Sequence, residues 1–172
     1  MARRIVTGNR EDGKSYFVST APTMPALDMG RGQITDLWVD EQDRAASDND
    51  YDPVAGGFWT LIPPDGASVV RISTFMPADR SDMPSEAERE ENRKHFDFGG
   101  VMEQGAPGWH TTPTIDYGIV LEGEIVLELD EGEVTMGPGD IVIQRKTRHH
   151  WHNRSGKPCR MVFVLISSPA YQ

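Results

Sequence analysis

Residues 148–153 read RHHWHN and contain three of the five histidines in this 172-residue chain. A histidine side chain can bind a metal ion, transfer a proton near neutral pH, or form a hydrogen-bonded part of a protein core. Because successive side chains of a strand point to opposite faces, His149 and Trp151 are expected to share one face. His150 and His152 take the other face, and we expect them to be surface side chains rather than partners of His149.

A second polar group precedes a strand-like run. Residues 110–116 read HTTPTID, and the same alternation predicts that His110, Thr112, Thr114 and Asp116 point to one face. A metal site, a catalytic base with its neighbours and a hydrated polar patch are the alternatives that these residue types leave open. Which of these three alternatives applies depends on the strands that carry the residues and on where the strands place the side chains.

Short apolar runs separated by glycine and proline dominate the chain, which holds 17 glycines and 12 prolines. This punctuation is typical of an all-β fold rather than of alternating strands and helices. Residues 3–20 predict a hairpin with Asp12-Gly13 in its turn, and residues 42–52 predict an exposed loop. Further strands are expected at residues 34–39, 57–63, 67–77, successively between 114 and 144, and finally at 159–167.

One segment interrupts the β pattern and predicts a helix. Ser85 and Glu88 form the S-x-x-E pattern of a capping box, in which each residue satisfies a free amide of the other. Glu90 and Lys94 stand one turn apart in the favourable order, and Gly99-Gly100 offers a left-handed exit. We expect about three turns, lying on the surface because the segment is mostly charged.

Two longer stretches together resemble the two sequence motifs of the cupin superfamily, in its single-domain cupin-2 form. In the first, GWHTTPTIDYGIVLEGE, His110 stands at the first motif histidine and Asp116 at the motif glutamate. In the second, PGDIVIQRKTRHHWHN, His149 and Asn153 match the H-x3-N ending. The resemblance covers residues 68 to about 167, with both motifs in the expected order.

This resemblance implies an all-β double-stranded β-helix, the cupin or jelly-roll barrel, whose motif side chains hold a metal ion inside. The implied ligands here are His110, Asp116 and His149, and the implied cofactor is one divalent ion of iron, manganese, nickel or zinc. Two imidazoles and a carboxylate are the ligands of non-haem iron(II) sites, which keep positions open for substrate and oxygen. They also suit zinc with water in the fourth position.

The chain departs from the family pattern at the site itself. Thr112 stands where the family has its second histidine, and Asp116 is one methylene shorter than glutamate. Core histidines in a barrel without metal are therefore the alternative for His110 and His149. An unpaired buried carboxylate costs several kcal/mol, so Asp116 should be accompanied by a cation, either a metal ion or Arg71.

Roles follow from these positions. Thr112, in the vacated ligand position, would hydrogen-bond a metal-bound water or the substrate. Trp109 and Trp151 would form an aromatic wall if they face the cavity, and are core residues otherwise. The expected catalytic residues are Thr112, Asp116 and His149, and the expected substrate-binding residues are Arg71, Trp109, Thr114 and Trp151.

About thirty residues, 78–108, separate the strand at 67–77 from Trp109-His110. Long excursions within compact domains tend to be lids or binding segments, and Phe96, Phe98 and Met102 could cover the barrel mouth and exclude water. A surface helix without such a role is the alternative. We therefore expect one domain, 1–172, with an N-terminal strand extension (1–67), a barrel (68–77 and 109–167) and a helical insertion (78–108).

The whole chain narrows the class of protein. Its length fits one domain, and its single cysteine, Cys159, allows no internal disulfide and suits a reducing cytoplasm. No secretory signal follows the first arginines, and no run reaches the ~20 apolar residues of a membrane span. A net charge of −10 repels phosphate backbones, so nucleic acid is not an expected partner.

These observations predict a cytoplasmic enzyme that acts on a small organic substrate at the metal site. The resemblance implies a dioxygenase, decarboxylase, isomerase or lyase, and the ligand set slightly favours a non-haem iron oxygenase. A metal-free barrel that binds a small ligand, or a metal-free acid–base isomerase, is the alternative. Since cupins often pair through N-terminal strands, the resemblance also implies a homodimer.

Overall fold

The computed structural model of the chain describes residues 3–41, 49–57 and 60–167. These residues form mostly strands and one helix, α1 (Glu86–Lys94), as predicted. None of the helices in this described part is long and apolar enough to cross a membrane. The strands are β1 (Val6–Asn9), β2 (Ser15–Ser19), β3 (Leu27–Asp28), β4 (Gly32–Asp40), β5 (Ser68–Phe75), β6 (Thr114–Glu122), β7 (Ile125–Leu129), β8 (Gly132–Met136), β9 (Ile141–Arg145), β10 (His150–His152) and β11 (Cys159–Ser167).

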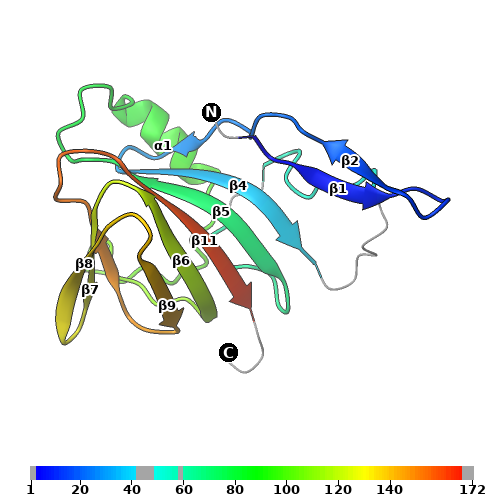
Figure 1. Ribbon diagram of the computed structural model, residues 1–172. Coiled ribbons are helices and arrows are strands. Elements are labelled where there is room, and N and C mark those ends of the chain that lie inside the picture. The colour runs from blue at the N-terminus through cyan, green and yellow to red at the C-terminus, as the bar shows by residue number, and fades with distance from the viewer. Residues whose placement is uncertain (1–2, 42–48, 58–59, 168–172) are drawn as a thin grey trace.

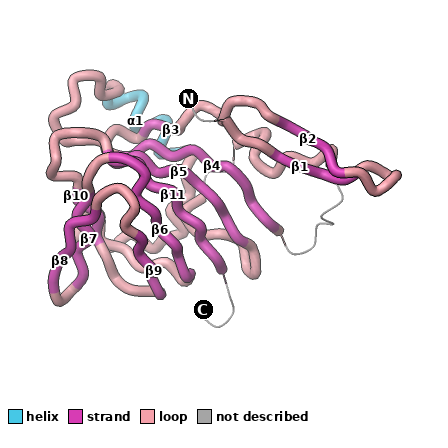
Figure 2. Tube along the Cα trace, in the orientation of Figure 1, coloured by secondary structure: helices cyan, strands magenta, loops and turns pink. Residues whose placement is uncertain are grey.

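Two antiparallel sheets form the barrel (Figure 1, Figure 2). The larger has the order β3-β4-β5-β11-β6-β9, and the smaller has the order β10-β7-β8. The N-terminal extension therefore supplies two strands, β3 and β4, to the same sheet as the motif strands. The predicted hairpin is present as β1 and β2, which pair only with each other and stand off to one side of the barrel in Figure 1.

The apolar core lies between the two sheets. Strand β11 alternates strictly between buried and partly buried residues along its whole length. Its buried members pack against β6, β7 and β8, and each apolar side chain of this size gains about 1.5–3 kcal/mol from burial. The cluster consists of Val120, Ile125, Leu127, Met136, Cys159, Met161, Phe163 and Leu165.

The turn between β6 and β7 depends on Gly123. Its φ is +79°, and a Cβ at this position would lie 2.4 Å from the carbonyl oxygen of Pro158. Both the left-handed backbone and the close approach of the chain before β11 therefore require glycine. This turn lets β6 of the large sheet continue directly into β7 of the small one.

Helix α1 begins with the predicted capping box. The Ser85 hydroxyl accepts a hydrogen bond from the Glu88 amide at 3.3 Å, and the Ser85 amide donates to the Glu88 carboxylate at 2.9 Å. The helix has nine residues, none buried, and is shorter than the three turns expected. Asn92 anchors it by donating to the carbonyl oxygen of Asp28 in β3 at 2.7 Å.

Several local predictions were wrong or fall outside the described residues. The helix ends at His95, which is right-handed (φ −82°), so Gly99-Gly100 does not provide its exit. Lys94 pairs with Glu91 at 3.1 Å rather than with Glu90. The strand expected at 57–63 is reduced, in its described part, to one isolated bridge at Thr60, because proline limits pairing there. Residues 42–48 of the predicted loop, and 58–59, lie outside the described residues.

A charged pair is buried in the middle of the large sheet. The side chains of Asp36 and Arg71 are 1% and 2% exposed, and the Arg71 Nε lies 3.0 Å from the Asp36 Oδ1. The two residues are direct partners across β4 and β5. Burial raises the pKa of Asp36 to about 6, although Arg71 counteracts it. Each of the two buried charges is therefore compensated by the other, and removing one leaves the other without its counter-charge.

We predict that Asp36→Leu destabilises the protein by about 3 kcal/mol or more at pH 7.5, because Arg71 loses its main counter-charge in a buried position. The double variant Asp36→Leu/Arg71→Met should recover much of this loss. Urea unfolding followed by circular dichroism measures both. Glu133→Ala, which breaks an exposed pair with Arg154, is the control and should change little. A double variant no more stable than Asp36→Leu would contradict the account.

Candidate functional site

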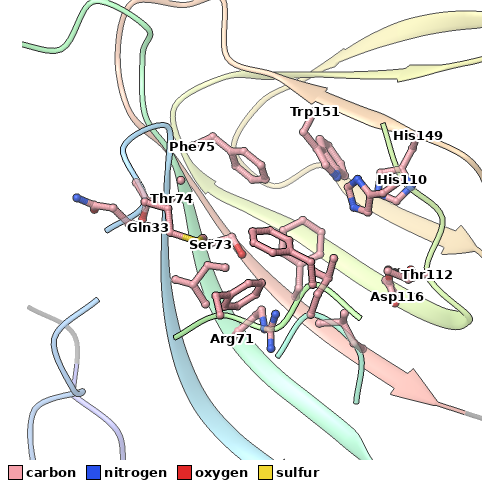
Figure 3. Close-up of a pocket in the computed structure, with 18 of the residues that line it drawn as sticks. Gln33, Arg71, Ser73, Thr74, Phe75, His110, Thr112, Asp116, His149 and Trp151 are labelled. Atoms are coloured by element: carbon pink, nitrogen blue, oxygen red, sulfur yellow. Dashed lines mark hydrogen bonds between the residues drawn. The ribbon is translucent and has the colours of Figure 1, made fainter. Parts of the chain in front are cut away.

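A cavity of about 200 Å³ lies inside the barrel (Figure 3). It is bounded by strands of the large sheet, by β10 and by the insertion. Its apolar lining is Met29, Ile34, Leu61, Phe75, Phe96, Phe98, Met102, Trp151, Phe163 and Leu165. Its polar lining is Gln33, Arg71, Ser73, Thr74, His110, Thr112, Asp116, Gln144 and His149.

The backbone brings the two motif histidines together. His110 and His149 form an isolated antiparallel bridge, with N–H to O=C distances of 3.1 and 3.0 Å in the two directions. Their rings lie side by side with centroids 4.1 Å apart (Figure 3). Two segments about forty residues apart in sequence thus place both imidazoles at one point of the cavity wall.

Both imidazoles are held in the same tautomer. The Nδ1 of His110 lies 3.0 Å from the carbonyl oxygen of Gly108, and the Nδ1 of His149 lies 2.8 Å from that of Thr147. A carbonyl oxygen only accepts, so each Nδ1 carries the proton. In a neutral ring, Nε2 then carries a lone pair. Two lone-pair nitrogens are therefore placed beside one another.

The surroundings keep both rings neutral. Burial lowers the pKa of His149 to about 4, with His110 adding to the effect, and burial also lowers the pKa of His110. Metal ligation requires neutral imidazole. A second ring nitrogen that donates to a backbone carbonyl is the usual outer partner of a metal-ligating histidine.

Asp116 lies on a different part of the cavity lining from the histidine pair. It is 4% exposed, and its Oδ1 has no hydrogen-bond partner. The Thr112 hydroxyl lies 3.4 Å from its Oδ2, and Thr114 donates to Thr112 at 2.9 Å. Burial raises the pKa of Asp116 to about 6, against the opposing effects of these hydroxyls and of Arg71.

These donors fit a metal ion in part. Paired neutral imidazoles with free Nε2 atoms, together with an orphaned carboxylate oxygen, are the groups that a divalent ion satisfies. The ligand atoms of His110, Asp116 and His149 are nevertheless not all within 4.8 Å of one another. Among the described residues, ligand atoms lie that close to one another in a different group, which consists of Glu128, His150 and His152. The histidine pair therefore fits metal ligation as it stands, and Asp116 lies farther along the cavity.

The other predicted residues are divided between the cavity and its surroundings. Arg71 and Trp151 line the cavity, whereas Thr114 is fully buried behind Thr112. Trp109 is not a lining residue, so it forms no aromatic wall: its ring packs on His150, with centroids 5.7 Å apart, and on the guanidinium of Arg148 at 3.9 Å.

Gln144 was not predicted to have a role and is the main addition to the site. It is 4% exposed and lines the cavity, and neither its Oε1 nor its Nε2 has a hydrogen-bond partner. It lies directly across from Asp116 in the pairing of β6 with β9. A signal was available, since Gln144 is the polar residue at an inward-facing position of the apolar strand IVIQR.

The insertion reaches the cavity. Phe96, Phe98 and Met102 all line it, and the two phenylalanine rings pack edge to face with centroids 4.8 Å apart. Phe96 is buried, and its ring lies 5.9 Å from the Arg71 guanidinium. Helix α1 itself stays on the surface. The segment after the helix, rather than the helix, closes this side of the cavity.

This chain is similar to a family model, to related sequences and to solved structures. A family model described as Cupin domain matches residues 100–165. The chain is 31% identical over 173 residues to phomopsin biosynthesis cluster protein C′ of Diaporthe leptostromiformis, covering 96% of this chain and 78% of that protein. It is 48% identical over 61 residues to the cupin-domain-containing oxidoreductase virC of Hypocrea virens, covering 33% and 31% of the two chains. The solved cupin domain of Schizosaccharomyces pombe Cnp3 aligns at 9% identity and a TM-score of 0.48, covering 97% of this chain and 88% of that one.

We predict that replacing residues 85–105 with a short Gly-Ser linker leaves a folded barrel with an exposed cavity, because Phe96, Phe98 and Met102 are removed. Circular dichroism and a cooperative melt would report the fold, and binding of the apolar dye ANS should rise several-fold. Glu88→Ala, which removes only the capping box, is the control and should leave dye binding unchanged. A folded deletion variant with unchanged dye binding would show that the insertion does not cover the cavity.

Proposed function

This protein belongs to the cupin superfamily, and we propose that it is an oxidoreductase that transforms a small, largely apolar organic substrate in its cavity. In this proposal one divalent metal ion, with iron favoured, binds to His110 and His149. The names of relatives such as virC of Hypocrea virens support the oxidoreductase class. The metal and the reaction are inferred from this chain's own side chains.

The observation that carries the proposal is the paired histidines. Both Nδ1 atoms donate to backbone carbonyls, and neither Nε2 has a hydrogen bond to the described protein. The two lone-pair nitrogens belong to rings whose centroids are 4.1 Å apart, so both are open to a cation or a donor in the cavity. A divalent ion satisfies both at once and leaves coordination positions open toward the cavity.

The cavity limits the substrate class. Its volume of about 200 Å³ is below the roughly 300–1,000 Å³ of pockets for drug-sized ligands. Phenylalanine, leucine, isoleucine and methionine dominate its lining, which favours a compact apolar body. The amide of Gln144, which has no partner among the described residues, is available for one or two polar atoms on that body. The Thr112 hydroxyl is already engaged with Asp116 and Thr114.

Each residue has a distinct part in the proposal. A bound metal ion supplies Lewis-acid or redox chemistry to the substrate's polar group. Asp116, with its pKa raised to about 6, accepts a proton from the substrate or returns one near neutral pH. Thr112 orients the Asp116 carboxylate, and Gln144 orients the substrate. Phe96, Phe98 and Met102 exclude water, which strengthens every polar interaction in the site.

A metal-free acid–base isomerase is the second candidate. The observation that favours it is the separation of Asp116 from the histidine pair, since a general base needs its own approach to the substrate. In that reading His110 and His149 are hydrogen-bonding groups and Asp116 alone moves the proton. Both candidates use the same cavity and differ in whether the histidine pair binds an ion.

With Glu128→Gln introduced throughout, to disable the other group of candidate ligands, we predict that the protein binds Fe²⁺ under anaerobic conditions. His110→Ala and His149→Ala should each weaken this binding by more than about 10-fold, because each removes a direct ligand rather than an outer-shell partner. Competition with a coloured chelator gives the affinities. His95→Ala, at an exposed histidine on the end of α1, is the matched control and should bind as the Glu128→Gln protein does. Equal affinity in all four proteins would favour the metal-free isomerase.

We also propose that the protein forms a homodimer through its N-terminal hairpin. Ile5 is 54% exposed and Phe17 is 68% exposed, although both are large and apolar. The hairpin stands off from the barrel in Figure 1, and the two side chains are left largely uncovered by the described residues. A second copy of the hairpin would bury them.

We predict that Phe17→Glu shifts the protein from dimer to monomer in size-exclusion chromatography with light scattering, because a buried charge would oppose the contact. Ile141→Glu is the control: Ile141 is 63% exposed on β9, at the opposite edge of the large sheet from β3. A dimer that survives Phe17→Glu but dissociates with Ile141→Glu would place the interface on the sheet instead.

A further inference from the structure

A second group of metal-ligating side chains lies on the outside of the barrel. Glu128 in β7 and His150 in β10 are direct partners across the two strands, and His152 is two residues farther along β10. One ligand atom from each lies within 4.8 Å of the other two. Strand alternation turns these side chains away from the cavity that His149 and Trp151 line.

The histidines of this group are already assembled around the carboxylate. The His150 and His152 rings have centroids 3.8 Å apart, and His152 Nε2 is hydrogen-bonded to the Glu128 carboxylate. The His150 Nδ1 lies 3.9 Å from the same carboxylate oxygen, which is too far for a hydrogen bond. An ion that draws all three ligand atoms to ~2.0–2.2 Å would close that gap.

One ligand atom lacks any hydrogen-bond partner among the described residues. The Nδ1 of His150 is buried and unbonded, whereas most buried polar atoms in proteins are hydrogen-bonded. Its position is fixed, because Trp109 packs on the ring and a Cβ on Gly108 would lie 2.2 Å from His150 Nε2. The ring is thus held with an unsatisfied nitrogen directed toward Glu128.

The group remains open to ions from solvent. The side chains of His150, His152 and Glu128 are 20%, 25% and 33% exposed. The nearby cation Arg154 is engaged by Glu133, with contacts of 2.8 and 3.0 Å, so its charge is partly neutralised. Two imidazoles and a carboxylate with one exposed side leave room for water as a fourth ligand, which is a zinc-type arrangement.

We propose that Glu128, His150 and His152 bind one zinc-class divalent ion, and that this ion fastens β10 to β7 on the outside of the barrel. Strand β10 has three residues and pairs with β7 alone, so it has few other attachments. It directly follows His149, and the Gly108 that contacts His150 also bonds His110. The ion therefore stabilises the segments that carry both cavity histidines without touching the cavity.

The test separates this ion from any ion in the cavity. Co²⁺ is titrated into the double variant His110→Ala/His149→Ala, which lacks the cavity histidines, and the visible absorption bands of bound Co²⁺ are followed. We expect one Co²⁺ per chain. Adding Glu128→Gln or His152→Ala in that background should weaken Co²⁺ binding by at least 10-fold, while adding His95→Ala should leave it unchanged.

Melting of the same His110→Ala/His149→Ala variant, in which the cavity histidines cannot bind the ion, gives a second readout. Zn²⁺ at about 100 times its dissociation constant should raise Tm by about 5 °C or more, and Glu128→Gln should abolish this shift. Circular dichroism without metal tests whether each variant is folded. If His152→Ala is not folded, His152→Gln is used in its place. Failure of the double variant to bind Co²⁺, or binding unaffected by Glu128→Gln and His152→Ala, would overturn the proposal.

Discussion

The buried guanidinium of Arg71 is the constraint on which the arrangement of this barrel depends. It lies 3.0 Å from Asp36 in β4 and 2.5 Å from the carbonyl oxygen of Thr60, and it stands beside the ring of Phe96. Burying an isolated charge is strongly unfavourable. The chain therefore surrounds Arg71 with partners from three separate segments, which contain Asp36, Thr60 and Phe96. The N-terminal extension and the insertion are thereby attached to the same point of the sheet.

Arg71 also lines the cavity. Burial raises the pKa of Asp116 there to about 6, and the hydroxyls of Thr114 and Thr112, followed by Arg71, act in the opposite direction. The apolar cluster fills the barrel between β11 and the small sheet, so the polar groups are left together around the remaining space. Paired neutral histidines on one wall and a partly protonated carboxyl on another are thus consequences of how the interior is divided.

Strand parity and motif spacing were enough to predict much of this from the sequence. Parity separated His149 from His150 and His152, and the Ser85 capping box located the start of the helix but not its end. The prediction that His150 and His152 are plain surface side chains was incomplete, because it took account of one strand only. Glu128 comes from β7, and strand register across a sheet cannot be read from a single strand.

Other errors have similar physical causes. Trp109 was expected to form part of an aromatic wall if it faced the cavity, yet the turn at Gly108 directs its ring to Arg148 and His150. Gln144 was overlooked, although it has inward parity and its side-chain amide has no hydrogen-bond partner among the described residues. In both cases the long-range contact, rather than the local pattern, decides where the side chain points.

The central claim is that the histidine pair in the cavity binds a metal ion. The most direct measurement is an anomalous difference map from crystals grown with Mn²⁺ or Fe²⁺ and recorded at the absorption edge of the metal. The account predicts a peak within coordination distance of the Nε2 atoms of both His110 and His149, facing the cavity. A map of a fully metal-soaked crystal with no peak at that position, whatever it shows at Glu128, would contradict the claim.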